Sequence, residues 1–171
     1  MTKALLLIDL QNDYFPGGAF ALWNTDAVLD AVDAAIAKAL ENDVAIIHIQ
    51  HVADPEAGIA PFFNEGTMGA QIHKRIREAA PDAPVVVKHY ADSFHETTLA
   101  EELSKVGATE LLVAGMMTQN CVTHTAISKA AEAYDVTVLP DCCTTVNEML
   151  HMIALHALST RVKLVPSTEA L

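Results

Sequence analysis

The sequence predicts an α/β fold: a doubly wound sheet of about six mainly parallel strands with helices on both faces. Three observations indicate this. Short apolar runs recur along the 171 residues, helical segments separate them, and the runs lack the strict alternation of half-buried strands. A chain of this length buries enough surface for one core, so we expect residues 1–171 to form a single domain.

The expected strands are rich in Val, Ile and Leu, as strands buried on both sides of a parallel sheet are. They cover residues 4–8, 44–49, 85–87, 111–114, 136–139 and 162–165. Parallel strands are joined by right-handed crossovers, and the binding sites of such sheets lie at the carboxyl ends of the strands. Residues that directly follow a strand are therefore the first candidates for function.

Helix signals occupy the segments between these strands. Residues 26–40 carry an apolar stripe at helical spacing. Thr98 and Thr145 each precede a glutamate by three residues, which matches a capping box at a helix start. Gly107 is expected to end the helix that Thr98 begins.

The segment 54–69 is rich in glycine and proline and predicts a long surface loop. A basic helix is expected directly after this loop, around residues 73–77. The connection between the second and third strands is therefore the least regular part of the predicted fold.

The charge balance excludes two classes of partner. Lys and Arg number 10 against 22 Asp and Glu, a formal net charge of −12, so the protein repels nucleic acid and anionic membranes. The apolar start, residues 4–8, is too short for a signal peptide or a membrane span. Three cysteines without a C-x-x-C pair indicate reduced thiols, and we expect a cytoplasmic protein.

An acid, an amine and a thiol each follow a central strand: Asp9, Lys88 and Cys121. Cys121 is expected near the start of a helix from Thr118 to about Tyr134, where the helix dipole favours a thiolate. The Asp9 carboxylate is suited to accept the thiol proton. Each residue alone has an ordinary structural explanation, for Cys121 that of a small buried apolar side chain.

Three motifs resemble those of the isochorismatase-like cysteine hydrolases, which include nicotinamidases and related amidases. They are LIDLQND at residues 7–13, KHYADSFHETTL at 88–99 and GMMTQNCVTHTA at 115–126, and the similarity covers nearly the whole chain. The resemblance implies a triad of Cys121 as nucleophile, Asp9 as acid and base, and Lys88. It also implies an isochorismatase-like hydrolase fold and a homo-oligomer, a dimer or a tetramer.

The resemblance further implies a cis peptide bond between Met116 and Met117, and an oxyanion hole made by the amides of Met117 and Cys121. The expected reaction is hydrolysis of a small amide through a thioester, without a cofactor. Members that hydrolyse the vinyl ether of isochorismate lack the cysteine, so Cys121 favours an amide substrate.

The sequence departs from the nicotinamidases at the end of the second strand, where their metal-binding Asp-x-His pair is absent. Metal-ligand types are still present at His48, His51, Asp54 and His73. Because the expected pair is missing, we predict no metal.

Aromatic residues beside the motifs are candidates for the wall of a substrate pocket. They are Phe15, Phe20, Trp23, Tyr90 and Phe94, and Ser93 and Thr97 are candidates to orient polar parts of a substrate. Cys142 and Cys143 are expected to serve packing.

Two further functions remain open. One is hydrolysis of an isochorismate-like vinyl ether, in which Asp9 acts as the acid and Cys121 is dispensable. The other is a non-catalytic role of the same pocket in small-molecule binding or thiol redox signalling.

Overall fold

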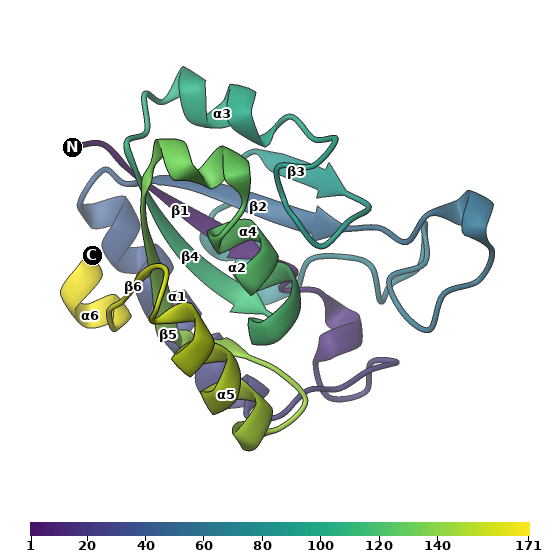
Figure 1. Ribbon diagram of the computed structural model, residues 1–171. Helices are drawn as coiled ribbons and strands as arrows, with labels where there is room; N and C mark the ends of the chain where they lie inside the picture. Colours follow the sequence, from purple (N-terminus) through teal and green to yellow (C-terminus); the bar gives the residue numbers. More distant parts are fainter.

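The structure, a computed structural model, describes residues 1–171 and contains one sheet of six parallel strands in the order β3-β2-β1-β4-β5-β6. This confirms the predicted fold class. Each expected strand is present within a few residues of its predicted position (Figure 1). The strands are β1 (Lys3–Ile8), β2 (Ala45–His51), β3 (Val85–Lys88), β4 (Glu110–Met116), β5 (Asp135–Thr144) and β6 (Lys163–Leu164).

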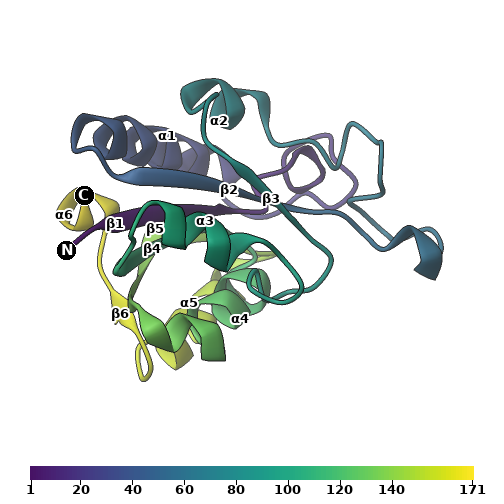
Figure 2. The ribbon, with the colours of Figure 1, turned by 90° about the horizontal axis from the view of Figure 1, so that it is seen from above.

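Helices cover both faces of the sheet, as Figure 2 shows. One face carries α1 (Thr25–Glu41), α2 (Lys74–Ala79) and α6 (Ser167–Ala170), and the other carries α3 (Leu99–Lys105), α4 (Thr123–Ala126) and α5 (Glu148–Leu158). Two apolar clusters fill the layers between the sheet and the helices. Alternate residues of β1 enter opposite clusters: Leu5 and Leu7 contact the α1 side, while Leu6 and Ile8 contact the α3 side.

The strand order places a topological switch point between β1 and β4. From β1 the chain builds outward through β2 to β3, and from β4 it builds in the other direction through β5 to β6. Ligands of open α/β sheets bind outside the carboxyl ends of the strands at such a point. The residues that follow Ile8 and Met116 therefore lie where a ligand is expected to bind.

Two local predictions about helix starts are wrong. The Thr98 side chain does not cap α3, and instead the Thr97 hydroxyl accepts a hydrogen bond from the Leu99 amide. The last long helix starts two residues later than a Thr145 cap predicts, at Glu148, and Asn147 caps it by accepting from the Leu150 amide. Asn, like Ser and Thr, has a short side-chain oxygen that accepts hydrogen bonds from the free amides at a helix start. Thr145 and Asn147 were therefore both possible caps for this helix.

The helix expected from Thr118 to Tyr134 is also broken. A π-helical turn covers Thr118–Val122, α4 ends at Ala126, and a 3-10 turn covers Lys129–Ala133. The side chain of Ser128 causes the last break, because it caps the 3-10 turn and donates to Asp92. The prediction that Gly107 ends α3 agrees with the structure, where this glycine has a φ of 64° just after the helix.

The connection from β2 to α2 is the long loop that the sequence predicts, and it projects from the carboxyl end of the sheet (Figure 1). One residue of this loop, Phe63, is nevertheless buried, and its amide donates to the Asp13 carboxylate. None of the helices has the length and apolar composition needed to cross a membrane.

Candidate functional site

Asp9 is the first residue after β1, and its backbone conformation turns the chain at the switch point. Its φ of 53° lies in the left-handed region, which is uncommon for a residue with a side chain. Its amide still donates to the Ile49 carbonyl of β2, at 3.1 Å. The side chain is fully buried, so the carboxylate depends on protein groups for its partners.

Lys88, the last residue of β3, supplies the main partner. Its Nζ lies 3.1 Å from Asp9 Oδ2 and 3.2 Å from Cys121 Sγ, and its side chain is fully buried. It also lies 3.0 Å from the Tyr90 carbonyl oxygen. A buried ammonium is tolerable only when it is paired and hydrogen-bonded, and these contacts satisfy it.

His51 is the fourth member of this cluster, and the sequence did not predict it there. It ends β2, the strand that lies between β1 and β3, and its register partner is Lys88. Its Nδ1 lies 2.8 Å from Lys88 Nζ and 3.9 Å from Asp9 Oδ2. The side chain of Lys88 therefore crosses the end of β2 to reach Asp9, and it contacts His51 there.

The charges of the cluster favour a neutral imidazole and a protonated thiol. Burial and the neighbouring Lys88 ammonium lower the pKa of His51 to about 4. Burial and the negative charge of Asp9 raise the pKa of Cys121, and Lys88 opposes this only in part. Burial and the Asp9 carboxylate therefore oppose the expected effect of the helix start, which favours a thiolate at Cys121.

A proton acceptor for this thiol is nevertheless close by. The Sγ of Cys121 and a ligand oxygen of Asp9 lie within 4.8 Å of each other. Asp9 Oδ1 is buried and has no hydrogen-bond partner. The cluster thus pairs a thiol that carries a proton with a carboxylate that has a free lone pair.

The segment before Cys121 offers an unused hydrogen-bond donor. The peptide bond between Met116 and Met117 is cis, and the Met117 amide donates no hydrogen bond within the protein. Thr118, expected to cap a helix, instead shares a hydrogen bond of 2.8 Å with His151 Nδ1. Because His151 belongs to α5, this hydrogen bond attaches the turn that contains Cys121 to that helix.

The four candidate metal ligands do not converge. His48 is buried and hydrogen-bonded to the Ala80 carbonyl, Asp54 caps a 3-10 turn in the exposed loop, and His73 packs against Phe15. Only His51 lies near Asp9 and Cys121, and those three residues form a group of metal-ligand type. Lys88 Nζ contacts all three, so its ammonium takes the place that a cation would need.

The seven predicted pocket residues divide into two groups. Phe15 is buried in one apolar cluster, Phe94 is half-buried and packs against the other, and Ser93 and Thr97 form hydrogen bonds with Thr125 and with nearby backbone. Phe20, Trp23 and Tyr90 keep part of their surface accessible to solvent. These three remain candidates for contact with a substrate.

Tyr14 is a site neighbour that the sequence interpretation passed over. Its ring is buried against Phe63, with ring centres 4.5 Å apart. Burial raises the pKa of the Tyr14 hydroxyl, and the negative charge of Asp9 adds to this effect. The signal was available, since Tyr14 directly follows the first motif and precedes Phe15, which was a candidate pocket residue.

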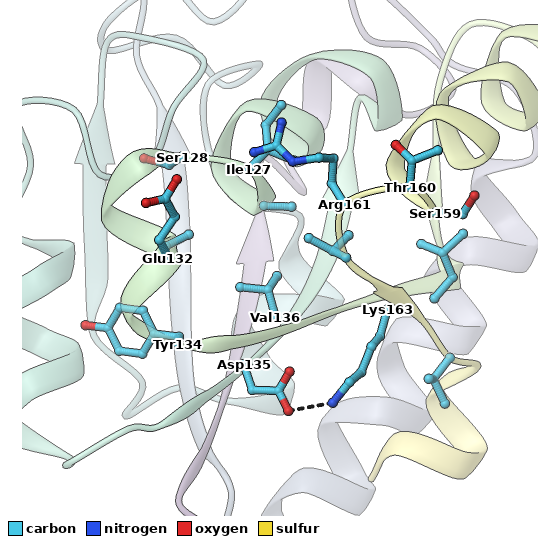
Figure 3. A pocket seen from close by; sticks show the side chains of 15 residues that line it. Ile127, Ser128, Glu132, Tyr134, Asp135, Val136, Ser159, Thr160, Arg161 and Lys163 are labelled. Carbon is cyan, nitrogen blue, oxygen red and sulfur yellow. Dashed lines mark hydrogen bonds and ion pairs between the residues drawn. The ribbon is translucent and has the colours of Figure 1, made fainter.

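A separate cavity lies away from this cluster. It has a volume of about 780 Å³ and is lined by the start of β5, the segment around β6 and the 3-10 turn after α4. Figure 3 shows its polar rim, where Asp135 and Lys163 form an ion pair. It contains none of Asp9, Lys88 or Cys121, and the amino end of β5 is not where sheets of this type bind ligands.

The other strand-end residues have structural roles. Asp141 accepts hydrogen bonds from the amide and the hydroxyl of Ser167, which holds α6 to β5. Cys142 and Cys143 are buried in opposite apolar clusters, in agreement with the packing role predicted for them.

Comparison with known proteins gives one consistent result. A family model described as "Isochorismatase domain" matches residues 3–170. The uncharacterized isochorismatase family protein YddQ of Bacillus subtilis is 34% identical over 180 residues, covering 99% of this chain and 98% of its own length. Nicotinamidase of Escherichia coli is 28% identical, covering 85% of this chain and 84% of its own length.

Solved structures show the same similarity. An isochorismatase family protein from Desulfovibrio vulgaris superimposes with a TM-score of 0.87 at 26% identity, over 98% of this chain and 95% of that one. The matched region includes β1, β3 and β4 and the three residues at or after their ends, Asp9, Lys88 and Cys121. The chain therefore belongs to the isochorismatase family of hydrolases.

Proposed function

We propose that this protein is a cysteine amidohydrolase that cleaves the C–N bond of a small amide through a thioester on Cys121. The observation that carries the proposal is the Lys88 ammonium, which lies 3.1 Å from the Asp9 carboxylate and 3.2 Å from the Cys121 sulfur. A nucleophile, a proton acceptor and a positive charge within contact distance are the parts that nucleophilic acyl transfer needs. A nicotinamidase among the relatives supports an amide substrate.

In the first step Cys121 transfers its proton to Asp9 as the sulfur attacks the amide carbonyl. The S–H bond breaks, an O–H bond forms on Asp9, and the charge moves from the carboxylate to the substrate oxygen. That oxygen then accepts hydrogen bonds from the amides of Met117 and Cys121. Asp9 donates the proton to the leaving nitrogen, which leaves as ammonia or an amine.

In the second step a water molecule attacks the thioester. Asp9 accepts the water proton and the carboxylic acid is released, with Cys121 restored to a thiol. Lys88 keeps its positive charge beside whichever of the two groups is negative. Phe20, Trp23 and Tyr90 are the residues that we propose contact the acyl group, with Tyr14 offering its hydroxyl.

The proposal includes no metal, because the Lys88 ammonium fills the position between the available ligands. It also includes a cytoplasmic homo-oligomer, for which the analytical mass of the purified protein in solution is the test. The expected partner in the reaction is a small-molecule amide substrate.

Ammonia release from a panel of small primary amides tests the proposal. The wild-type protein and Cys121→Ala are compared, each with and without a metal chelator. We expect release by the wild type alone and no effect of the chelator. Release by a folded Cys121→Ala protein at the wild-type rate contradicts the proposal, and failure with every amide favours vinyl-ether hydrolysis or binding without turnover.

A further inference from the structure

The Lys88 ammonium has more neighbours than hydrogens. Four acceptor atoms surround Nζ: Asp9 Oδ2 at 3.1 Å, Cys121 Sγ at 3.2 Å, His51 Nδ1 at 2.8 Å and the Tyr90 carbonyl oxygen at 3.0 Å. A lysine ammonium has three N–H groups and no acceptor. One of the four neighbours must therefore share a hydrogen or go without one.

Two of these neighbours can act only as acceptors in this geometry. The Tyr90 carbonyl carries no proton, and a protonated Nδ1 on His51 would point its hydrogen at a cation. His51 thus has the tautomer with its proton on Nε2. Each of these two shorter contacts takes one hydrogen of Lys88, and the third hydrogen is left between Asp9 and Cys121, whose distances differ by only 0.1 Å.

His51 is held firmly in this position by Gln11, a buried residue of the first motif. The Gln11 side chain accepts from the His51 amide at 2.8 Å and donates to the His51 carbonyl at 2.7 Å. The same side-chain nitrogen donates to the Ala70 carbonyl at 2.8 Å. The end of β2 is therefore fixed both to the end of β1 and to the loop beside it.

We propose that His51 is a positioning residue that occupies one Lys88 hydrogen and thereby limits the Asp9–Cys121 pair to one negative charge and one transferable proton. With a single hydrogen available to the pair, a carboxylate and a thiolate cannot both be hydrogen-bonded by Lys88. The proton that leaves Cys121 then stays on Asp9. This role rests on the proposed function, since that retained proton is the one that the leaving nitrogen needs.

The charged and titratable groups around the pair are few. Lys88, Asp9 and His89 face His51, and Asp9, Lys88 and Tyr14 face Cys121. His89 lies on the solvent side, where its Nδ1 contacts the Val52 carbonyl at 2.7 Å and not Lys88. Substitution of His89 therefore provides a control for changes in the local electrostatics that leave the Lys88 hydrogens as they are.

The test is the pH profile of Cys121 alkylation by iodoacetamide, followed by the mass of the peptide that contains Cys121. The variant His51→Leu removes the acceptor at nearly constant size and frees a second hydrogen for the pair. A thiolate beside an ionised Asp9 then becomes tolerable, and the midpoint of the profile should move down by about 1 pH unit or more, because a hydrogen bond to a charged group has an energy of this order.

Two matched variants separate this effect from damage to the fold. His51→Asn keeps an acceptor near the position of Nδ1 and should restore the wild-type midpoint, whereas His89→Leu should leave it unchanged. Loosened packing alone would raise the alkylation rate at every pH without moving the midpoint. Thermal unfolding of each variant confirms that the compared proteins are folded.

The alkylation assay needs no substrate, so it is independent of the proposed function. An unmoved or raised midpoint in His51→Leu overturns the role of His51, even if the enzyme hydrolyses amides. A lowered midpoint with rescue by Asn supports that role, even if no amide is hydrolysed. Where an amide is found, the alkaline limb of kcat for His51→Leu should shift to lower pH in parallel.

Discussion

At the scale of single residues, the Asp9–Lys88 pair combines stability and chemistry. Both side chains are fully buried, so neither charge is screened by water, and each depends on the other. Burial of the pair therefore costs free energy of folding, which a functional role explains. In the proposed reaction that role is to activate the Cys121 thiol, 3.2 Å from Lys88.

Asp9→Asn is expected to be harmful in two ways. Turnover should fall by about 100- to 10,000-fold, because the amide cannot accept the thiol proton. Stability should fall by about 3–5 kcal/mol, because Lys88 is left as a buried charge without its counter-ion. Urea unfolding measures the second effect, and the double variant Asp9→Asn, Lys88→Met should recover part of it. Equal losses for the single and the double variant would contradict a direct coupling between these two charges.

At the scale of elements, the close approach of β1 and β4 brings Asp9 and Cys121 together. Gly115 of β4 pairs with Ile8 of β1 and has a φ of 128°. A Cβ at this position would lie 2.0 Å from the Ile8 carbonyl oxygen, which is backbone and cannot move aside. The glycine therefore sets the spacing of the two strands next to the site.

Gly115→Ala should destabilise the protein by about 3 kcal/mol or more, since backbone strain and overpacking act together. Gly66→Ala is the matched control, because Gly66 also has a positive φ of 74° but nothing within 4 Å of a new Cβ. It should lose only about 1 kcal/mol, the strain alone. Chemical denaturation of both variants checks the difference, and equal losses would show that the contact with Ile8 does not matter.

At the scale of the whole molecule, several histidines resist protonation in the folded state. Burial is the leading cause that lowers the pKa of His48, His51, His73 and His151. For His51 the value in the folded protein is about 4, against 6.5 for the ordinary side chain. The unfolded chain therefore binds more protons than the folded one between these two pH values.

The free energy of unfolding should accordingly be highest above pH 6.5 and fall as the pH is lowered toward 4. His51 alone accounts for up to about 3 kcal/mol across this window. Urea unfolding at a series of pH values checks the slope. His51→Asn should flatten it, whereas His156→Asn, at an exposed position, should not. A stability that is independent of pH between 7 and 4 would contradict this assignment.

The sequence predicts the sheet well because six Val-, Ile- and Leu-rich runs have few alternatives to burial in parallel strands. It does not predict where the helix after Cys121 is interrupted. The Ser128 hydroxyl accepts from the Ala130 amide and donates to the Asp92 carboxylate, and these hydrogen bonds end the helical pairing there. This competition between a side chain and the backbone involves Asp92, a residue that is distant along the chain. The local sequence pattern around Ser128 therefore does not reveal it.

Part of the candidate site could also be predicted from the sequence, because the strands that position it could be predicted. Asp9, Lys88 and Cys121 directly follow or end strands, and strand ends meet at one edge of the sheet. His51 was missed as their neighbour although it ends the strand between those of Asp9 and Lys88, because the order of strands within the sheet is not visible in one sequence. Its contact with Lys88 Nζ follows once that order is known.

In the proposed reaction Cys121 carries the acyl group during turnover. Acid quenching of the wild-type protein during hydrolysis of a slow amide, followed by mass analysis of the Cys121 peptide, tests it most directly. We expect this peptide to gain the mass of the acyl group, and hydroxylamine to remove it. Turnover with an unmodified Cys121 peptide, together with a Cys121→Ala protein that remains active, would contradict it.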